Sequence, residues 1–120
     1  PVGTGFLADV VRDWEAAAAP ARDAGIRTVH SRFGVILGPG DGILGKMLPP
    51  FRLGLGGRLG SGKQWMSWVS IRDAVRILRF LMEEPKAEGP VNAVSVEQVT
   101  NHTFTRALGR AVGRPALVPV

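Results

Sequence analysis

The sequence has 120 residues, 45% of them apolar, which is enough for one small domain and no more. It contains no cysteine and no tyrosine, so disulfides, thiolate metal sites, a cysteine nucleophile and a tyrosine acid/base are excluded. The net charge of +5 would suit a polyanion, but the arginines are scattered without a basic run, so we expect a solvated surface and no nucleic-acid partner.

An amphipathic helix is predicted over residues 6–24, because apolar residues recur there at helical spacing and charged residues fill much of the opposite face. Gly25 is the expected C-terminal stop, and Pro20 predicts a kink or a shortened last turn.

Residues 26–37 are rich in β-branched and apolar side chains without strict alternation, which is typical of a strand covered on both faces. A loop of turn-forming residues follows at 38–42. Residues 43–48 then predict a short helix that Pro49 and Pro50 bring to an end.

The tract from residue 51 to residue 62 is rich in glycine but keeps a phenylalanine and three leucines. A mobile linker would be polar, so we interpret this tract as a loop whose backbone approaches a ligand closely.

A strand is predicted at 64–70, and Ser70 with Asp73 forms a capping box that opens a helix at 71–84. The apolar side chains of that helix are expected to point largely inward: Val75, Leu78, Phe80, Leu81 and Met82. The remaining predictions, in chain order, are a turn at 85–90, a strand at 91–96, a helix at 103–112 capped by Thr100 or Asn101, and an extended tail at 116–120. Helices and strands alternate along the chain, which predicts an α/β fold.

Several chemical sites are excluded. Residues 57–63 fit the first seven places of the phosphate-loop pattern GxxxxGK[ST], but Gln64 occupies the eighth place and a strand-like segment follows. His30 and His102 lack further ligands at metal-binding spacing, so we predict no metal site, and no GxSxG elbow is present. Without a long apolar run or a signal-peptide pattern, we expect a cytoplasmic protein with no membrane partner.

Six blocks of sequence carry a family resemblance: GFLADVVRDWE at 5–15, RFGVILG at 32–38, LPPFRLGLGG at 48–57, GSGKQWMSW at 60–68, GPVN at 89–92 and FTRALGR at 104–110. Through them the chain resembles, over essentially its whole length, the atypical extended short-chain dehydrogenase/reductases called epimerase family proteins or nucleoside-diphosphate-sugar epimerases.

The resemblance implies the C-terminal part of a Rossmann-like NAD(P)-binding fold plus a small substrate-binding subdomain. Residues 1–42 would be the last helix-strand unit of the Rossmann-like domain, and residues 43–120 a partial substrate-side subdomain. Family members begin with a half that carries the glycine-rich NAD(P) motif. That N-terminal Rossmann half is missing here, so we expect it, or a second copy of the chain, to cover the open edge of the sheet.

The resemblance also implies site residues. Those expected beside NAD or NADP in the full-length protein are Phe33, Gly34, Val35 and Ile36. Those expected on the substrate side of the cleft are Met47, Phe51, Gly56, Gly57, Gln64, Trp65 and Trp68. Glycine allows backbone N–H groups to reach a ligand, and tryptophan offers a stacking face, although ordinary core packing explains a tryptophan equally well.

The implied function is an NAD(P)-dependent epimerase- or dehydratase-like oxidoreductase that acts on a small, nucleotide-linked substrate. Where typical short-chain enzymes have Tyr-xxx-Lys, this sequence has Leu7 and Val11, which cannot move protons. The alternative is therefore a non-catalytic Rossmann-like binding or regulatory protein. No catalytic residue can be named, and we expect the chain by itself to bind NAD(P)H negligibly.

Overall fold

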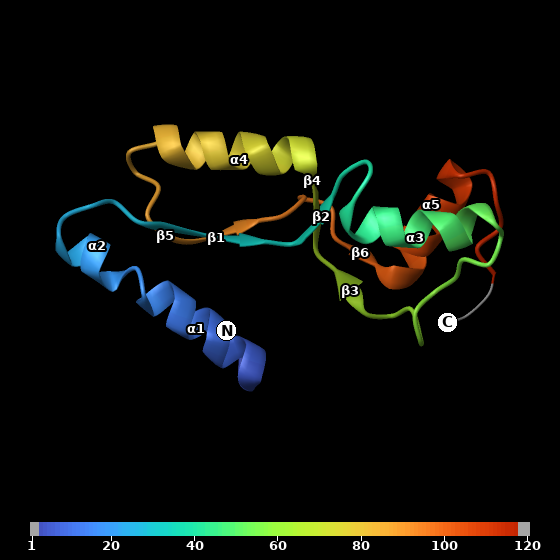
Figure 1. Cartoon of the computed structure of the whole chain (residues 1–120), viewed down its shortest axis with the longest axis horizontal. Coiled ribbons are helices and arrows are strands. Elements are labelled where there is room, and N and C mark those ends of the chain that lie inside the picture. Colours follow the sequence, from blue (N-terminus) through green and yellow to red (C-terminus); the bar gives the residue numbers. More distant parts are fainter. Residues whose placement is uncertain (1–2, 118–120) are drawn as a thin grey trace.

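The computed structural model describes residues 3–117, which form five helices and six strands (Figure 1). In chain order they are α1 Phe6–Ala16, α2 Ala19–Asp23, β1 Val29–Phe33, β2 Val35–Leu37, α3 Gly42–Arg52, β3 Trp65–Met66, β4 Trp68–Ser70, α4 Ile71–Glu83, β5 Gly89–Ala93, β6 Val99–Thr100 and α5 Asn101–Ala111. Residues 118–120 of the predicted tail lie outside the described range.

The strands pair in three short ladders. β1 runs parallel to β5, with Val29 opposite Gly89, and β2 runs parallel to β4, with Val35 opposite Trp68. β3 and β6 form the third, antiparallel pair. Parallel pairs joined through helices are the α/β arrangement, which confirms the predicted fold class.

The molecule is elongated, with extents of 54 × 32 × 22 Å (Figure 1). We call its two ends the arm, made of α1, α2, β1, β5 and α4, and the lobe, made of α3, β3, β6, α5 and the glycine-rich tract. In the arm, α4 lies on one side of the β1–β5 pair and α1 on the other. The radius of gyration is 17.6 Å, whereas a compact domain of this length would have about 14 Å. The described residues therefore do not close around one core.

The predicted helix at 6–24 is two helices. α1 ends at Ala16 and α2 starts at Ala19, as the kink predicted from Pro20 requires, because proline cannot donate the next helical hydrogen bond. The predicted stop at Gly25 is confirmed. Its φ is 80°, and its N–H donates to the carbonyl of Arg22.

The prediction that Pro49 and Pro50 end the third helix was wrong. Both lie inside α3, which continues to Arg52. The fixed φ of proline is already helical, and the carbonyls of Pro49 and Pro50 still accept hydrogen bonds from the amides of Leu53 and Leu55. The helix ends at Arg52 instead, and Gly54, with a φ of 75°, lies just after its C-cap.

Two predicted strands are each divided. The segment at 26–37 breaks at Gly34 into β1 and β2, and the segment at 64–70 breaks at Ser67 into β3 and β4. At both points the chain changes its pairing partner. The strand predicted at 91–96 is β5, which starts two residues earlier, at Gly89, and ends at Ala93. The short strand β6 was not predicted. Thr100 caps α5 through its side chain, as expected.

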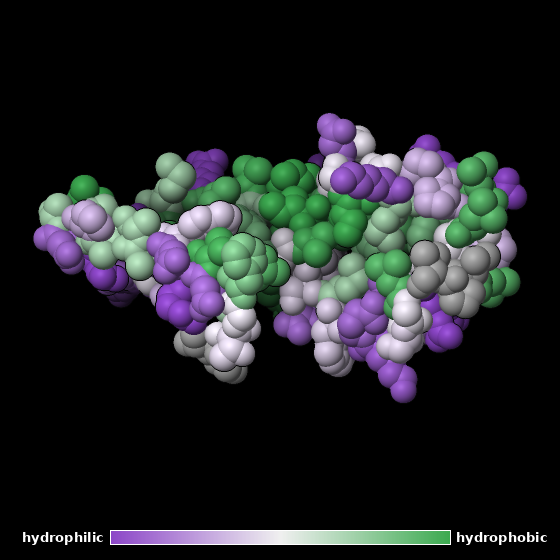
Figure 2. All heavy atoms as spheres, turned by 60° about the horizontal axis from the view of Figure 1, so that its bottom comes forward, coloured by the Kyte–Doolittle hydropathy of each residue, from purple (hydrophilic) through white to green (hydrophobic). Residues whose placement is uncertain are grey.

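The buried apolar core is small: Phe51, Val69, Ala74, Leu81 and Ala93. The prediction that the apolar face of α4 points inward was wrong for most of its members. Leu81 is buried, whereas Val75, Leu78, Phe80 and Met82 are exposed, because the described chain supplies only one layer for α4 to pack against. On the face shown in Figure 2, hydrophobic residues also gather near the middle of the molecule.

Arg27 fixes the far end of α4. Its guanidinium donates to the carbonyls of Leu81 at 2.9 Å, Met82 at 2.8 Å and Ala87 at 3.0 Å. A cation at the C-terminal carbonyls of a helix compensates both the unpaired acceptors and the helix dipole. This contact orients α4 along β1.

Arg32 joins β1 to α1. Its guanidinium donates two hydrogen bonds to the carboxylate of Glu15, at 2.7 and 2.8 Å. The hydrogen bond from Arg32 lowers the pKa of Glu15 below its ordinary value, and the charges of Arg32 and His30 act in the same direction. The pair is solvated, and its role is to hold a helix whose apolar residues make little other contact.

We expect acid to release α1 from the sheet. Because the pKa of Glu15 is lowered in the folded chain, its ion pair with Arg32 stabilises the docked position of α1 fully above the ordinary carboxyl pKa. This stabilisation is lost as the pH falls through the lowered pKa of Glu15. Glu15→Gln should produce the same release at neutral pH, measured as lower NMR order parameters along α1 while α4 stays rigid. Asp13→Asn, on the same helix but outside any described ion pair, is the control. Equal order in Glu15→Gln and the unmodified chain would contradict the expectation.

Candidate functional site

The carboxyl end of β1 is the junction between arm and lobe. Gly34 donates its N–H to the carbonyl of Ala93 at 3.3 Å, and Val35 donates to the carbonyl of Ser67 at 2.8 Å. A Cβ on Gly34 would lie 2.6 Å from the Ser67 oxygen, so only glycine fits this crossing. The predicted cofactor neighbours all lie here, and Ile36 is 40% exposed. Carboxyl ends of parallel strands are where α/β folds hold ligands.

Trp68 brings the predicted substrate side to the same place. It is the register partner of Val35, and its indole N–H donates to the carbonyl of Glu97 at 3.1 Å. That bond fixes the ring of a half-buried side chain. Trp65 differs, because it is 71% exposed on β3. The structure therefore places Val35 and Trp68 opposite each other in the β2–β4 pair, whereas Trp65 lies at the surface of the lobe.

The other predicted substrate residues shape the lobe. Phe51 is 3% exposed, and its ring lies under Gly56, where a Cβ would come within 2.4 Å of it. Gly57 is also buried, and Met47 is half-buried on α3. Gln64 donates its amide to the carbonyl of Leu59 at 3.0 Å and so closes the loop at 59–64. Their predicted contacts with a substrate stay predictions.

Sequence reasoning missed two buried polar anchors. Asn101 is 1% exposed, and its side-chain oxygen accepts the N–H of Leu59 at 2.8 Å. Thr105, also 1% exposed, donates to the carbonyl of Gly57 at 3.5 Å. Together they hold the glycine-rich tract on α5. The sequence predicts Asn101 only as a cap, because nothing in the sequence shows that it faces the tract.

The N-terminus of α5 is also occupied by this tract. The N–H groups of Asn101 and His102 donate to the carbonyls of Gln64 and Gly62, both at 2.9 Å. The tract therefore presents acceptors to the helix and leads into β3, whereas a phosphate loop presents donors to an anion and leads into a helix.

Leu7 and Val11 line a cavity of about 710 Å³ between α1 and the β1–β5 pair, together with Glu15, Arg32 and Pro90. Both side chains are hydrocarbon, so neither Leu7 nor Val11 can donate or accept a proton. Among residues 3–117, no cluster of three or more His, Asp or Glu side chains could hold a metal, and no helix there is long and apolar enough to cross a membrane.

A sequence model described as "NAD dependent epimerase/dehydratase family" matches residues 10–96, most of the chain and the whole junction. The chain belongs to this family. The expected resemblance is therefore confirmed, and the parallel strand pairs are part of a Rossmann-like fold.

Individual relatives agree. An epimerase family protein of Mycobacterium bovis is 53% identical over 113 residues, which are 94% of this chain and 38% of that protein. The crystal structure of human epimerase family protein SDR39U1 with NADPH superposes with a TM-score of 0.91 at 43% identity, covering 98% of this chain and 39% of that one. A nucleoside-diphosphate sugar epimerase from Corynebacterium glutamicum gives a TM-score of 0.79 at 39% identity, covering 98% of this chain and 25% of that one.

This chain thus spans about two fifths of the length of the curated relatives that it matches. In these relatives, most of the protein lies outside the matched region. This agrees with the small core of the chain and with the exposed apolar faces of α1 and α4.

Gly34→Ala tests the junction. The added methyl group would lie 2.6 Å from a backbone oxygen, so strands β2 and β4 must separate, and we expect a loss of about 1–3 kcal/mol in the free energy of unfolding. Gly3→Ala is the control, because its Cβ would meet only Ala8 at an ordinary 3.4 Å. Urea unfolding measures both, and equal stability of the two variants would contradict this account of the crossing.

Asn101→Ala should loosen the tract. It removes a partly buried hydrogen bond to the N–H of Leu59, which costs about 1 kcal/mol, and hydrogen exchange should become faster at residues 59–64. Asn92→Ala, at an exposed position of β5, should change neither quantity. Unchanged exchange in Asn101→Ala would show that α5 does not hold the tract.

Proposed function

We propose that this chain supplies the substrate-side part of an NAD(P)-dependent epimerase- or dehydratase-like oxidoreductase that acts on a small, nucleotide-linked substrate. The observation that carries the proposal is the junction at Gly34, which sets Val35 opposite Trp68 at the carboxyl end of a parallel strand. The human relative's structure contains NADPH, and the relative from Corynebacterium glutamicum is called a nucleoside-diphosphate sugar epimerase.

The residues at the junction fit the nicotinamide end of such a cofactor. Phe33, Val35 and Ile36 are uncharged and partly exposed, and the missing side chain of Gly34 allows close approach. Bound NAD(P) would supply the hydride acceptor and donor. The role of this chain is then to exclude water from one side of the ring and to orient the substrate with the fixed indole of Trp68.

The rest of the cofactor needs a partner. The loop at 38–42 leads from β2 into α3, but its glycines, Gly38, Gly40 and Gly42, do not have the GxGxxG spacing of a pyrophosphate-binding turn. We propose that a Rossmann half of the kind that the longer relatives contain packs against α1, α4 and the free edge of β1. Exposed side chains on both helices, among them Phe6, Trp14 and Met82, would be buried by it.

A second candidate is a non-catalytic binding or regulatory protein on the same scaffold. Leu7 and Val11 favour it, because they place hydrocarbon on α1 where typical short-chain enzymes carry their acid/base pair. Both functions need the nicotinamide site, and they differ in whether a hydride moves.

A chimera tests the proposal. The matched 113 residues of the Mycobacterium bovis relative are replaced by this chain, so that the relative supplies the remaining parts. We expect NADPH binding by calorimetry in the chimera and none in the chain alone. Trp68→Ala in the chimera should weaken capture of UDP-sugars by about tenfold or more, equivalent to ~1.4 kcal/mol. Val96→Ala, at a fully exposed position outside the predicted site and the proposed interface, is the control.

Two results would overturn this assignment. A folded chimera that binds no NADPH would remove the cofactor role of the junction. Micromolar binding of NADPH by the chain alone would remove the need for a Rossmann half. An epimerase or dehydratase returns the hydride to its substrate, so the readout is conversion of the nucleotide sugar. Binding of NADPH and nucleotide sugars without any conversion of the sugar would favour the non-catalytic candidate.

A further inference from the structure

The positive charges of this chain are distributed unevenly with respect to acids. Four arginines elsewhere in the chain form ion pairs with carboxylates: Arg12 with Asp9, Arg32 with Glu15, Arg76 with Asp73 and Arg79 with Glu83. After Glu97 the sequence contains no aspartate or glutamate, yet it carries His102, Arg106, Arg110 and Arg114. The described part of this segment therefore has no acid of its own to neutralise it.

The last turn of α5 folds this segment into a groove. Gly113 has a φ of 66°, and the N–H groups of Gly113 and Arg114 donate to the carbonyls of Arg110 and Gly109 at 3.1 and 3.0 Å. This is the Schellman arrangement, which turns the chain back along the helix. Gly109 makes the return possible, because a Cβ there would lie 2.9 Å from the Cβ of Ala116.

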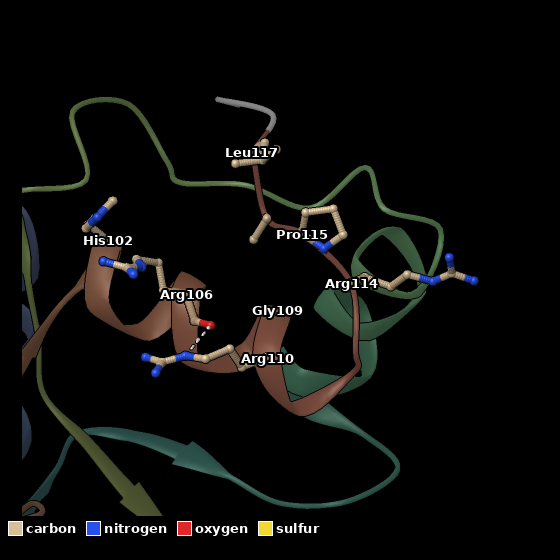
Figure 3. A pocket seen from close by; sticks show the side chains of 8 residues that line it. His102, Arg106, Gly109, Arg110, Arg114, Pro115 and Leu117 are labelled. Atoms are coloured by element: carbon tan, nitrogen blue, oxygen red, sulfur yellow. Dashed lines mark hydrogen bonds between the residues drawn. The ribbon is translucent and has the colours of Figure 1, made fainter.

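The groove has a cationic side and an apolar side (Figure 3). It encloses about 420 Å³ and is lined by His102, Arg106, Gly109, Arg110, Arg114, Pro115, Ala116 and Leu117. Arg106 and Arg110 extend to the same side of α5, whereas Arg114 extends away from them. No acidic residue lines it. None of the residues predicted to contact cofactor or substrate belongs to this lining.

The pair Arg106 and Arg110 is not explained by stability. Like charges four residues apart on a helix are destabilising by about 0.2–0.5 kcal/mol. Arg110 lies in the last turn, where it compensates the helix dipole, and its side chain reaches the Arg106 carbonyl only at a long 3.4 Å. Arg106 lies one turn earlier and makes no described ion pair. Such a pair is favourable when a multivalent anion lies between the two guanidinium groups.

We propose that this groove is a binding site for the phosphate groups of a small phosphorylated molecule. Arg106 and Arg110 hold the phosphates, His102 lies one turn further along the same face, and Pro115 with Leu117 contacts the uncharged part of the ligand. The volume is in the range of small-molecule sites. The proposal is independent of the proposed function, because it uses other residues.

Size and charge favour a small anion over a nucleic acid. From His102 to Arg110 the helix rises over eight residue-to-residue steps, or about 12 Å, which is long enough for two or three linked phosphates. A nucleic-acid backbone would need a longer basic surface, and three arginines on α1 and α4, Arg12, Arg76 and Arg79, are already paired with carboxylates.

Inorganic pyrophosphate is the probe, titrated into the chain at low ionic strength. We expect saturable one-to-one binding that weakens with added salt and raises the melting temperature. Arg106→Gln/Arg110→Gln should weaken it by about tenfold or more, while the melting temperature without pyrophosphate stays equal or rises. Leu117→Glu, at a position 81% exposed, should also abolish binding, because it places a carboxylate in the groove without removing a cation.

Arg76→Gln/Arg79→Gln is the matched control, since it removes the same charge from α4 and should leave the affinity unchanged. Equal loss in both double variants, or no saturation at millimolar pyrophosphate, would overturn the site. So would tighter binding of a single-stranded oligonucleotide that both double variants weaken, which would indicate a diffuse nucleic-acid surface. The chimera described above should bind pyrophosphate as the chain does, and loss of binding there would show that the groove is covered in a complete protein.

Discussion

The structure depends on one close backbone crossing. At Gly34 the chain leaves β5 and joins β4, and it does so with an approach to the Ser67 carbonyl that has no room for a side chain. The hydrogen bonds on either side of this point connect the arm to the lobe. The crossing lies at the carboxyl end of β1. This is the edge of a parallel sheet at which α/β folds hold ligands, so the residue that joins the two parts also lies at the candidate site.

The arm and the lobe are stabilised differently. In the lobe, the buried polar contacts of Asn101 and Thr105 fix a glycine-rich tract on α5, and Phe51 fills the space beneath it. In the arm, two arginines hold the helices in place: Arg27 binds the carbonyls at the end of α4, and Arg32 binds Glu15 on α1. Ion pairs and caps align helices without burying much apolar surface, so the arm keeps apolar faces that remain available to a further layer.

That division agrees with the family to which the chain belongs. The matched region is about two fifths of the relatives' length, so most of each relative lies outside the part that this chain represents. The chemistry follows the same division. Under the proposed function, the junction and Trp68 shape one side of a nicotinamide site, whereas Leu7 and Val11 supply no proton transfer. The cationic groove on α5 is separate from this site and depends on the turn at Gly113.

The sequence by itself determined the α/β class, the family and the helix signals: the stop at Gly25, the kink at Pro20 and the caps at Ser70 and Thr100 are local, since each depends on a few neighbouring residues. It also placed Phe33, Gly34, Val35 and Ile36 together, because they are consecutive. Only the tertiary structure decided where strands divide, that α3 continues through two prolines, which side of α4 is buried, and that Asn101 faces Leu59. Those features depend on contacts between segments far apart in the chain, and periodicity within one segment carries no information about the partner across from it.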